Sequence, residues 1–424
     1  VALMPHVFTT VWVPWMFLAV ERALQERGFL PHRGALILAL LIAMQVLAGA
    51  PKITYYTGLA LPLYWIARCM LRARAERAPV MRRVSEVLAQ GMAAAALAGL
   101  IAGIQLLPTA EFLQNAERAV IALDRLRGQA LNGSFIWTSL VGYTGDTIED
   151  TDSINAIGPG ALLLGLLALA HGRTRRLALP LWLVAIAGFL LSLGTLVSFW
   201  VDLLPLYGRF HAPRRALVFW TIAGCMAAGI GAAYLDACWR ARRFPRPLLY
   251  ALLLFLTAGT WWMLPRLERV FVHPGHLDPD PHIVERIGQD RFLTVDPTFA
   301  YSYDSRRPDF GRSMISNLAA LSNAYDVNGY DPLVPARYGE ARNLACARSG
   351  VFFPSHGVFF SDPNSPVLKL LNVQYVLGRH DLYAPGRLIP GTRIDHGELS
   401  ASLELVYPDE RWPLFRYREE RPLA

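Results

Sequence analysis

Three arginines, Arg209, Arg214 and Arg215, lie within seven positions of a segment that is also rich in proline and aromatic residues. A guanidinium group binds phosphate oxygens through paired N–H donors, so this cluster predicts a phosphate site. Anchoring of the segment to phospholipid headgroups explains the same residues without any substrate. Both interpretations place the arginines at a membrane surface.

Four acidic residues in a second segment are candidate metal ligands. They lie within seven positions and are Asp146, Glu149, Asp150 and Asp152. Mg²⁺, Mn²⁺ and Ca²⁺ take several oxygen ligands, which clustered carboxylates supply, so a divalent cation is one interpretation. The spacing differs from that of the EF-hand loop, and a solvated acidic loop is the simpler interpretation. The residues indicate no other cofactor.

The composition of the 424-residue chain indicates which elements must position these groups. Hydrophobic residues make up 54% and charged residues only 17%, whereas a soluble protein carries roughly 25% charged residues. A membrane helix needs roughly 17–25 residues, and a charge at its centre costs at least ~2.5–3.5 kcal/mol. Eight charge-free stretches are close to that length: 1–20, 34–51, 53–67, 87–110, 153–172, 177–201, 216–235 and 247–265. We expect a polytopic α-helical membrane protein with about eight transmembrane helices in residues 1–264.

The distribution of the arginines predicts the orientation of these helices. The formal charge of +8 divides into +10 for residues 1–264 (23 basic, 13 acidic) and −2 for residues 265–424 (18 basic, 20 acidic). Sixteen arginines lie in alternate loops, which the positive-inside rule assigns to the cytoplasm. The basic charge therefore indicates topology, and nucleic acid is not an expected partner. The segment with Arg209, Arg214 and Arg215 falls on the outer side, as does the long loop 111–152.

Residues 265–424 have the mixed composition of an extracytoplasmic α/β domain. Their patterns predict a helix at 281–288, strands at 291–295, 351–353, 357–360 and 373–377, and a hairpin of 403–407 with 412–418. Between them, the segment from Asn323 to Tyr338 is rich in Gly, Asn, Tyr and Pro and is predicted to be a loop. Its tyrosines, Tyr325, Tyr330 and Tyr338, could stack on sugar rings, although structural packing is the commoner use of tyrosine.

Motifs and chain ends add further expectations. The sequence has no metal-binding Cys or His spacing and no G-x-x-x-x-G-K-[ST] loop, so ATP-driven transport by this chain is not expected. The chain begins at Val1 without a basic leader. If the protein starts in the cytoplasm, an odd number of spans precedes Val1, and we expect an N-terminally truncated fragment. A valine read from the start codon is the alternative.

Five motifs together resemble one family, the YfhO-like bacterial membrane proteins, which are a branch of the GT-C glycosyltransferases. In order they are Leu47-Ala-Gly-Ala-Pro51, Gln105-Leu-Leu-Pro-Thr-Ala-Glu111 with Arg118, Ala212-Pro213-Arg214-Arg215, Asn328-Gly-Tyr-Asp-Pro-Leu333 with Arg337-Tyr338, and Leu370-Leu-Asn-Val-Gln-Tyr-Val-Leu377. Their order and spacing extend over most of the chain.

The resemblance implies a multi-pass enzyme of the bacterial cytoplasmic membrane. Such an enzyme transfers a sugar from a polyprenyl-phosphate carrier to a cell-envelope glycan or glycopolymer acceptor at the outer face. It implies donor-side roles for Glu111, Arg118 and Arg215, and acceptor-side roles for Tyr330, Arg337 and Tyr338. The catalytic aspartate of the family is expected upstream of Val1. Similar proteins also continue beyond Ala424, so we expect the fragment to be truncated at both ends and inactive by itself.

Two other functions remain open. A transporter or flippase for lipid-linked glycans would need polar groups inside the spans, where His6 and Gln45 are the main candidates. A lone polar residue in a span is more often part of a helix–helix contact. A non-catalytic envelope assembly protein is the third possibility, with residues 265–424 binding a partner.

Overall fold

We describe a computed structural model of the protein. It describes residues 4–26, 28–30, 32–115, 123–128, 130–131, 157–210, 213–241, 279–295, 323–328, 335–346, 362–378, 402–409 and 412–418, with four isolated positions between 247 and 258. Contacts divide the chain into two compact units. One contains residues 1–109 and 119–270, and the other contains residues 110–118 and 271–424.

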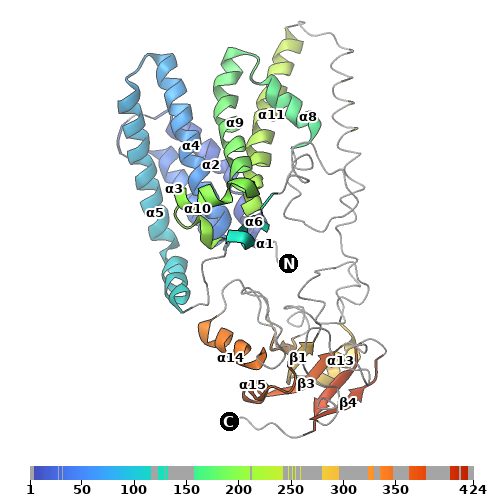
Figure 1. The fold of residues 1–424 in the computed structure, drawn as a ribbon. Coiled ribbons are helices and arrows are strands. Elements are labelled where there is room, and N and C mark those ends of the chain that lie inside the picture. Colours follow the sequence, from blue (N-terminus) through green and yellow to red (C-terminus); the bar gives the residue numbers. More distant parts are fainter. Residues whose placement is uncertain are drawn as a thin grey trace. The chain divides into compact units, whose positions relative to one another are not determined.

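The larger unit is built from helices (Figure 1). They are α1 (Met4–Thr10), α2 (Val13–Ala23), α3 (Arg33–Leu47), α4 (Pro51–Glu76), α5 (Val80–Gln114), α6 (Leu123–Gly128), α8 (Pro159–Leu167), α9 (Gly172–Ser192), α10 (Val197–Leu203) and α11 (Leu217–Arg240), with 3₁₀ turns η2 (Gly194–Leu196), η3 (Tyr207–Arg209) and η4 (Pro213–Ala216). Proline begins α4 and α8, where its fixed φ suits a first helical turn.

Three of these helices are long and apolar enough to cross a membrane: Val80–Phe112, Gly172–Ser192 and Pro213–Arg240. These three helices are consistent with a helical membrane protein, while a total of eight spans stays a prediction. The predicted stretch 177–201 is interrupted, because α9 ends at Ser192 and α10 begins at Val197. In the stretch 153–172 the helix α8 has nine residues. The stretch 247–265 lies almost entirely outside the described residues.

Helix α5 differs from its predicted end. The charge-free stretch was predicted to end at residue 110, but α5 continues through Pro108 to Gln114. The Thr109 hydroxyl donates to the Gln105 carbonyl at 2.7 Å. Leu100 and Ile104 of α5 are 80% and 81% exposed, as expected of a surface that faces lipid.

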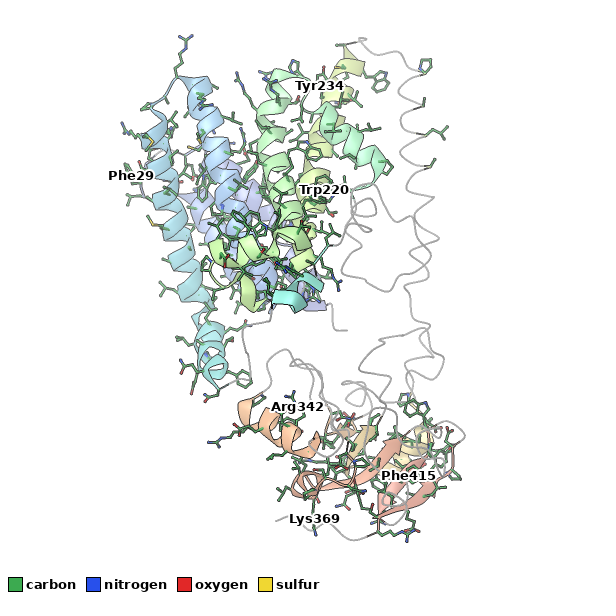
Figure 2. All side chains as sticks on the ribbon, in the orientation of Figure 1. Phe29, Trp220, Tyr234, Arg342, Lys369 and Phe415 are labelled. Carbon is green, nitrogen blue, oxygen red and sulfur yellow. The ribbon has the colours of Figure 1, made fainter. Side chains whose placement is uncertain are left out.

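Small residues allow α8, α9 and α11 to pack closely. A Cβ atom added to Gly188 of α9 would come within 2.8 Å of the Ala216 carbonyl oxygen, and one added to Gly231 of α11 would collide with the Leu164 carbonyl of α8. Membrane helices commonly use such residues to bring their backbones together. Trp220 of α11 (Figure 2) packs against α9, and its ring centre lies 5.8 Å from that of Trp182.

The smaller unit has a five-stranded mixed sheet in the order β2-β1-β3-β5-β4. The strands are β1 (Arg291–Val295), β2 (Tyr325–Asp326), β3 (Val373–Gly378), β4 (Leu403–Tyr407) and β5 (Leu414–Tyr417), and the helices are α13 (Pro281–Ile287), α14 (Ala336–Cys346) and α15 (Pro366–Leu370). β1 is parallel to β2 and β3, while β5 is antiparallel to β3 and β4.

Most predicted elements that fall on described residues of this unit are confirmed. The helix 281–288, the strands 291–295 and 373–377 and the hairpin 403–407 with 412–418 all lie where they were expected. The strands at 351–353 and 357–360 fall outside the described residues. The segment from Asn323 to Tyr338 is not all loop, because β2 forms at Tyr325–Asp326 and α14 begins at Ala336. The strand forms there because Tyr325 and Asp326 pair with Arg291 and Phe292.

Candidate functional site

Arg215 of the predicted phosphate cluster contacts a histidine that is far away in the sequence, near the start of the chain. It lies in η4, directly before α11, and its Nη1 atom is 2.8 Å from Nε2 of His6 in α1. A guanidinium group always donates, so Nε2 must accept and the ring proton of a neutral His6 must be on Nδ1. His6 therefore fixes one edge of the Arg215 guanidinium.

Aromatic residues connect the segment before η4 to the start of α4. Tyr55 donates its hydroxyl to the Pro205 carbonyl at 2.8 Å, and its ring lies 5.0 Å from that of Phe210. Tyr207 is buried and donates to the Leu191 carbonyl at 2.6 Å. These contacts hold the segment 205–210 against α4 and α9. They therefore help to position Arg214 and Arg215, which follow this segment in the sequence.

Tyr56, which follows Tyr55, was not identified from the sequence. Its side chain is 1% exposed, and among the described residues its hydroxyl has no hydrogen-bond partner. Arg215 and Tyr207 are both near enough to interact electrostatically with the phenol. The available signal was the pair of tyrosines four and five positions after Pro51, because neighbouring helical residues point about 100° apart and so have different environments.

For the other residues that were predicted to bind the sugar donor, the structure gives less information. Arg214 is half-buried in η4 beside Arg215, while the side chain of Arg209 and the whole of Arg118 lie outside the described residues. Glu111 is exposed near the end of α5 and belongs to the smaller compact unit. Its donor-side role stays a prediction.

The predicted metal ligands Asp146, Glu149, Asp150 and Asp152 all lie outside the described residues. Within the described ranges, no group of three or more His, Cys, Asp or Glu side chains is arranged to hold a metal ion. The divalent cation therefore stays a prediction from the sequence.

A second polar cluster lies in the smaller unit, where β1 and β2 end. Asp326 accepts hydrogen bonds at Oδ1 from the backbone N–H groups of Asn328 (3.0 Å) and Thr294 (3.4 Å). Asn328 in turn donates its side-chain amide to the Thr294 carbonyl at 2.5 Å. The side chains of Asp326 and Asn328 thus bond to the backbone of Thr294 in β1, beyond the point where β2 ends.

The remaining atoms of this cluster are buried without such partners. Neither Asp326 Oδ2 nor Thr294 Oγ1 has a hydrogen-bond partner in the described part of the chain. Burial raises the pKa of Asp326 to about 8, although the N–H groups of Asn328 and Thr294 act in the opposite direction. The carboxyl group is therefore largely protonated near neutral pH, and it lies at the carboxyl ends of parallel strands, where α/β proteins commonly bind ligands.

Of the predicted acceptor-side residues, Tyr338 belongs to this cluster. Its hydroxyl donates to the Val327 carbonyl at 3.0 Å, and burial, followed by the charge of Asp326, raises the pKa of the phenol. Tyr338 is thus engaged in holding the segment after β2. Arg337 is exposed on α14, and Tyr330 lies outside the described residues. The sequence identified the segment but not Asp326 or Thr294, which are far apart in the chain.

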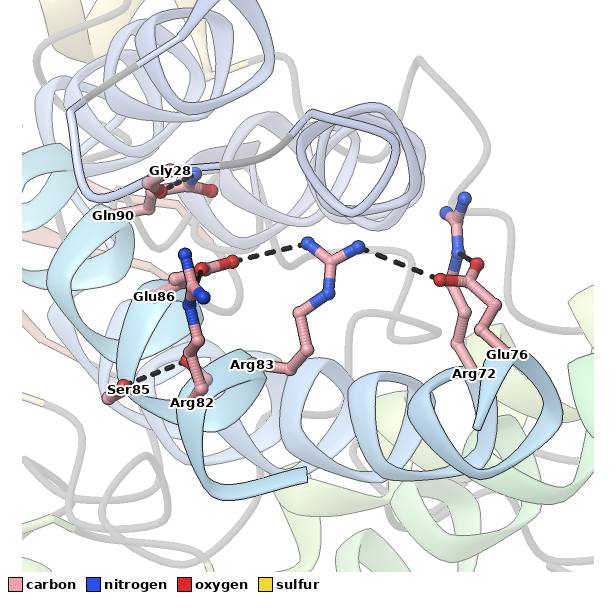
Figure 3. Close-up of polar contacts among 8 residues, drawn as sticks. All are labelled: Gly28, Arg72, Glu76, Arg82, Arg83, Ser85, Glu86 and Gln90. Atoms are coloured by element: carbon pink, nitrogen blue, oxygen red, sulfur yellow. Dashed lines mark hydrogen bonds and ion pairs between the residues drawn. The ribbon is translucent and has the colours of Figure 1, made fainter. Parts of the chain in front are cut away.

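The arginine-rich end of the larger unit carries a third cluster, shown in Figure 3. Arg83 lies between Glu86 (3.2 Å) and Glu76 (3.6 Å), and Glu76 also pairs with Arg72 at 2.7 Å. Gln90 of α5 donates to the Gly28 carbonyl at 2.8 Å. Because its charges are paired with one another, we interpret this cluster as a structural joint between α4, α5 and the loop after α2.

The sequence was also compared with known proteins. No protein-family model matches it, and no curated protein matches it significantly.

Proposed function

We propose that this chain belongs to a membrane glycosyltransferase of the GT-C type. In this proposal the enzyme transfers a sugar from a polyprenyl-phosphate carrier to a cell-envelope glycan or glycopolymer at the outer face of the bacterial cytoplasmic membrane. The observation that carries the proposal is the Arg215–His6 pair, together with the buried phenol of Tyr56, which is near enough to Arg215 to interact electrostatically. The resemblance of the five sequence motifs to the YfhO-like proteins supports the same assignment.

The chemistry of the donor suits this arrangement. The phosphate of a polyprenyl carrier remains at the bilayer surface because its charge cannot enter the hydrocarbon. A guanidinium held in place by His6 would bind that phosphate and stabilise the negative charge that develops on it as the sugar leaves. The acceptor hydroxyl must then lose a proton, which a carboxylate would accept as general base.

The smaller unit supplies candidates for the acceptor side. Arg337 is exposed at the start of α14, so it is accessible to a glycan. Tyr338 contributes indirectly, since its hydroxyl is already bonded to the Val327 carbonyl. We propose that Tyr330 and Arg337 contact the acceptor and that Tyr338 helps to position them, because it joins α14 to the segment after β2.

A transport function receives less support from the same residues. His6 and Gln45 are the polar groups in the predicted spans that a transport path would need. Gln45 is 1% exposed and donates to the Thr57 hydroxyl at 2.9 Å and to the Thr9 carbonyl at 3.2 Å. Both residues therefore make specific contacts between elements, as expected of interhelical hydrogen bonds.

Sugar transfer by the full-length protein in membranes tests the proposal directly. With a polyprenyl-phosphate-linked sugar as donor, Arg215→Ala should reduce the rate of transfer about 100-fold, which is typical for loss of one group that stabilises developing charge. Arg175→Ala is the matched control, because Arg175 is exposed in a predicted cytoplasmic loop. Unchanged transfer by Arg215→Ala would show that this residue is wrongly assigned, and absence of transfer with any such donor would exclude the enzyme class.

A further inference from the structure

Tyr55 and Tyr56 are adjacent on α4 but have different environments. Tyr55 is half-buried, and its hydroxyl donates to the Pro205 carbonyl at 2.8 Å. Tyr56 is 1% exposed, and no described residue forms a hydrogen bond with its hydroxyl. Buried polar groups in native proteins are nearly always hydrogen-bonded, so an exception needs an explanation.

The surroundings of Tyr56 indicate what kind of partner its hydroxyl could take. Arg215 interacts electrostatically with the phenol, and the neighbouring Tyr207 hydroxyl is already bonded to the Leu191 carbonyl. Lys52 lies one helical turn before Tyr56 and is 8% exposed, so it belongs to the same face of α4. A partner at this position would meet a hydroxyl donor in a positively charged environment.

The charge of the elements around Tyr56 favours an anion. The helix α1, the turns η3 and η4 and the first half of α4 contain Lys52, Arg209, Arg214 and Arg215 but no acidic residue. Such a one-sided set of charges creates a local potential that attracts negative ligands. Hydrogen bonds from a hydroxyl or guanidinium to an anionic oxygen are also stronger than those between neutral groups.

We propose that Tyr56 is a ligand-binding residue of the Arg215 site, where its hydroxyl donates to a phosphate oxygen of the polyprenyl carrier. His6 acts as a positioning residue, because it contacts the guanidinium of Arg215. This assignment rests on the proposed function, since the carrier phosphate is the anion of the glycosyl donor. It extends that function by adding an uncharged hydrogen-bond donor, the Tyr56 hydroxyl. A site with such a donor recognises the phosphate by more than the attraction between charges.

Binding of undecaprenyl phosphate to the full-length protein in phosphatidylcholine nanodiscs tests the assignment. We expect Tyr56→Phe to weaken binding about tenfold, which corresponds to the loss of one hydrogen bond to a charged group. The ligand-free variant should melt at the same temperature as the wild type or higher, because the substitution removes a hydroxyl without a partner. Tyr64→Phe is the matched control, because Tyr64 is on the same helix and its hydroxyl donates to Glu21 at 2.7 Å: it should lower the melting temperature and leave the affinity within about twofold.

The possible outcomes separate the two levels of the proposal. If the wild type does not bind undecaprenyl phosphate, the proposed function fails. If the wild type binds and Tyr56→Phe binds equally well, the function stands and the role of Tyr56 is wrong. A lower melting temperature for Tyr56→Phe, with affinity lost in proportion, would make the hydroxyl structural and also overturn the role.

The source of the phosphate is tested in the same system. Inorganic phosphate at millimolar concentration should not displace undecaprenyl phosphate, because it lacks the chain that the membrane retains. Nanodiscs of phosphatidylglycerol should compete only weakly. Displacement by inorganic phosphate would assign the site to free phosphate, and full competition by phosphatidylglycerol would assign it to lipid headgroups; either result overturns the carrier assignment.

Discussion

Arg68 and Glu21 form a two-point ion pair that joins α4 to α2, with Nε–Oε1 at 2.5 Å and Nη2–Oε2 at 2.7 Å. Tyr64 also donates to Glu21 Oε1 at 2.7 Å, and Arg68 donates to the Arg176 carbonyl at 3.2 Å. The arginine, which the sequence identified only as a marker of topology, therefore connects three helices at the arginine-rich end of the larger unit.

Replacement of Arg68 by methionine should destabilise the larger unit strongly. The substitution leaves the Glu21 carboxylate in a mostly buried position without its cation, which typically costs about 3–5 kcal/mol. The free energy of unfolding in mixed detergent micelles would measure the loss. Arg72→Met is the control, because Arg72 and Glu76 are each about one-third exposed and such pairs contribute less than about 1 kcal/mol. Equal effects of the two substitutions would contradict the interpretation.

The contact between His6 and Arg215 predicts a difference between two substitutions. His6→Gln retains an oxygen that accepts from the guanidinium and should keep undecaprenyl phosphate binding within about threefold of the wild type. His6→Leu removes the acceptor and should weaken binding about tenfold or more. Titration in nanodiscs measures both affinities. If the two variants bind equally, His6 does not position Arg215.

The protonated carboxyl group of Asp326 predicts a dependence of stability on pH. The pKa is about 8 in the folded protein and near 3.8 for an ordinary aspartate, so between these values the unfolded chain binds fewer protons than the folded one. Stability should therefore fall as pH rises from about 4 to 8, by at most about 1.4 kcal/mol per pH unit. Hydrogen exchange of the β1 amides in the full protein, corrected for intrinsic rates, measures this slope.

Asp326→Asn tests the origin of that slope. The amide is neutral at every pH, so the slope over this range should disappear. Its Oδ1 can still accept from Thr294 and Asn328, and its new N–H groups could donate to the Thr294 hydroxyl, which has no partner among the described residues. The variant should therefore protect β1 better than the wild type at pH 8. An unchanged slope would mean that another group titrates.

The glycines of α11 provide a matched pair of substitutions. Gly231→Ala should destabilise the larger unit, because its new methyl group would collide with the Leu164 carbonyl of α8. Gly229→Ala has open space around it and should be neutral or stabilise the helix by about 0.5–1 kcal/mol. Thermal unfolding in detergent would compare them. The opposite order of melting temperatures would show that α8 does not pack there.

Local sequence patterns were sufficient for part of this fold. The strands Arg291–Val295 and Val373–Gly378 were predictable because their runs of β-branched and aromatic residues are bounded by turn residues. The extent of α5 was not, because Pro108 normally marks a helix end, whereas α5 continues through it to Gln114.

The candidate site was predictable only in part for a related reason. Arg215 could be identified because the predicted topology places it on the outer side, where the positive-inside rule does not favour arginine. His6 and Tyr56 could not be joined to it, because they are 209 and 159 positions away in the sequence and only tertiary packing brings them together. The same holds for Asp326 and Thr294, which meet through parallel pairing of β1 and β2.

The shortness of strand β2 also has a consequence for self-association of the protein. β2 covers only Arg291 and Phe292 of β1, and an uncovered strand edge can recruit a strand from another molecule. Here the side chains of Asp326 and Asn328 occupy the N–H and C=O groups of Thr294. This stretch of the edge is therefore closed to an incoming strand, which guards the sheet against aggregation where the protein is crowded in a membrane.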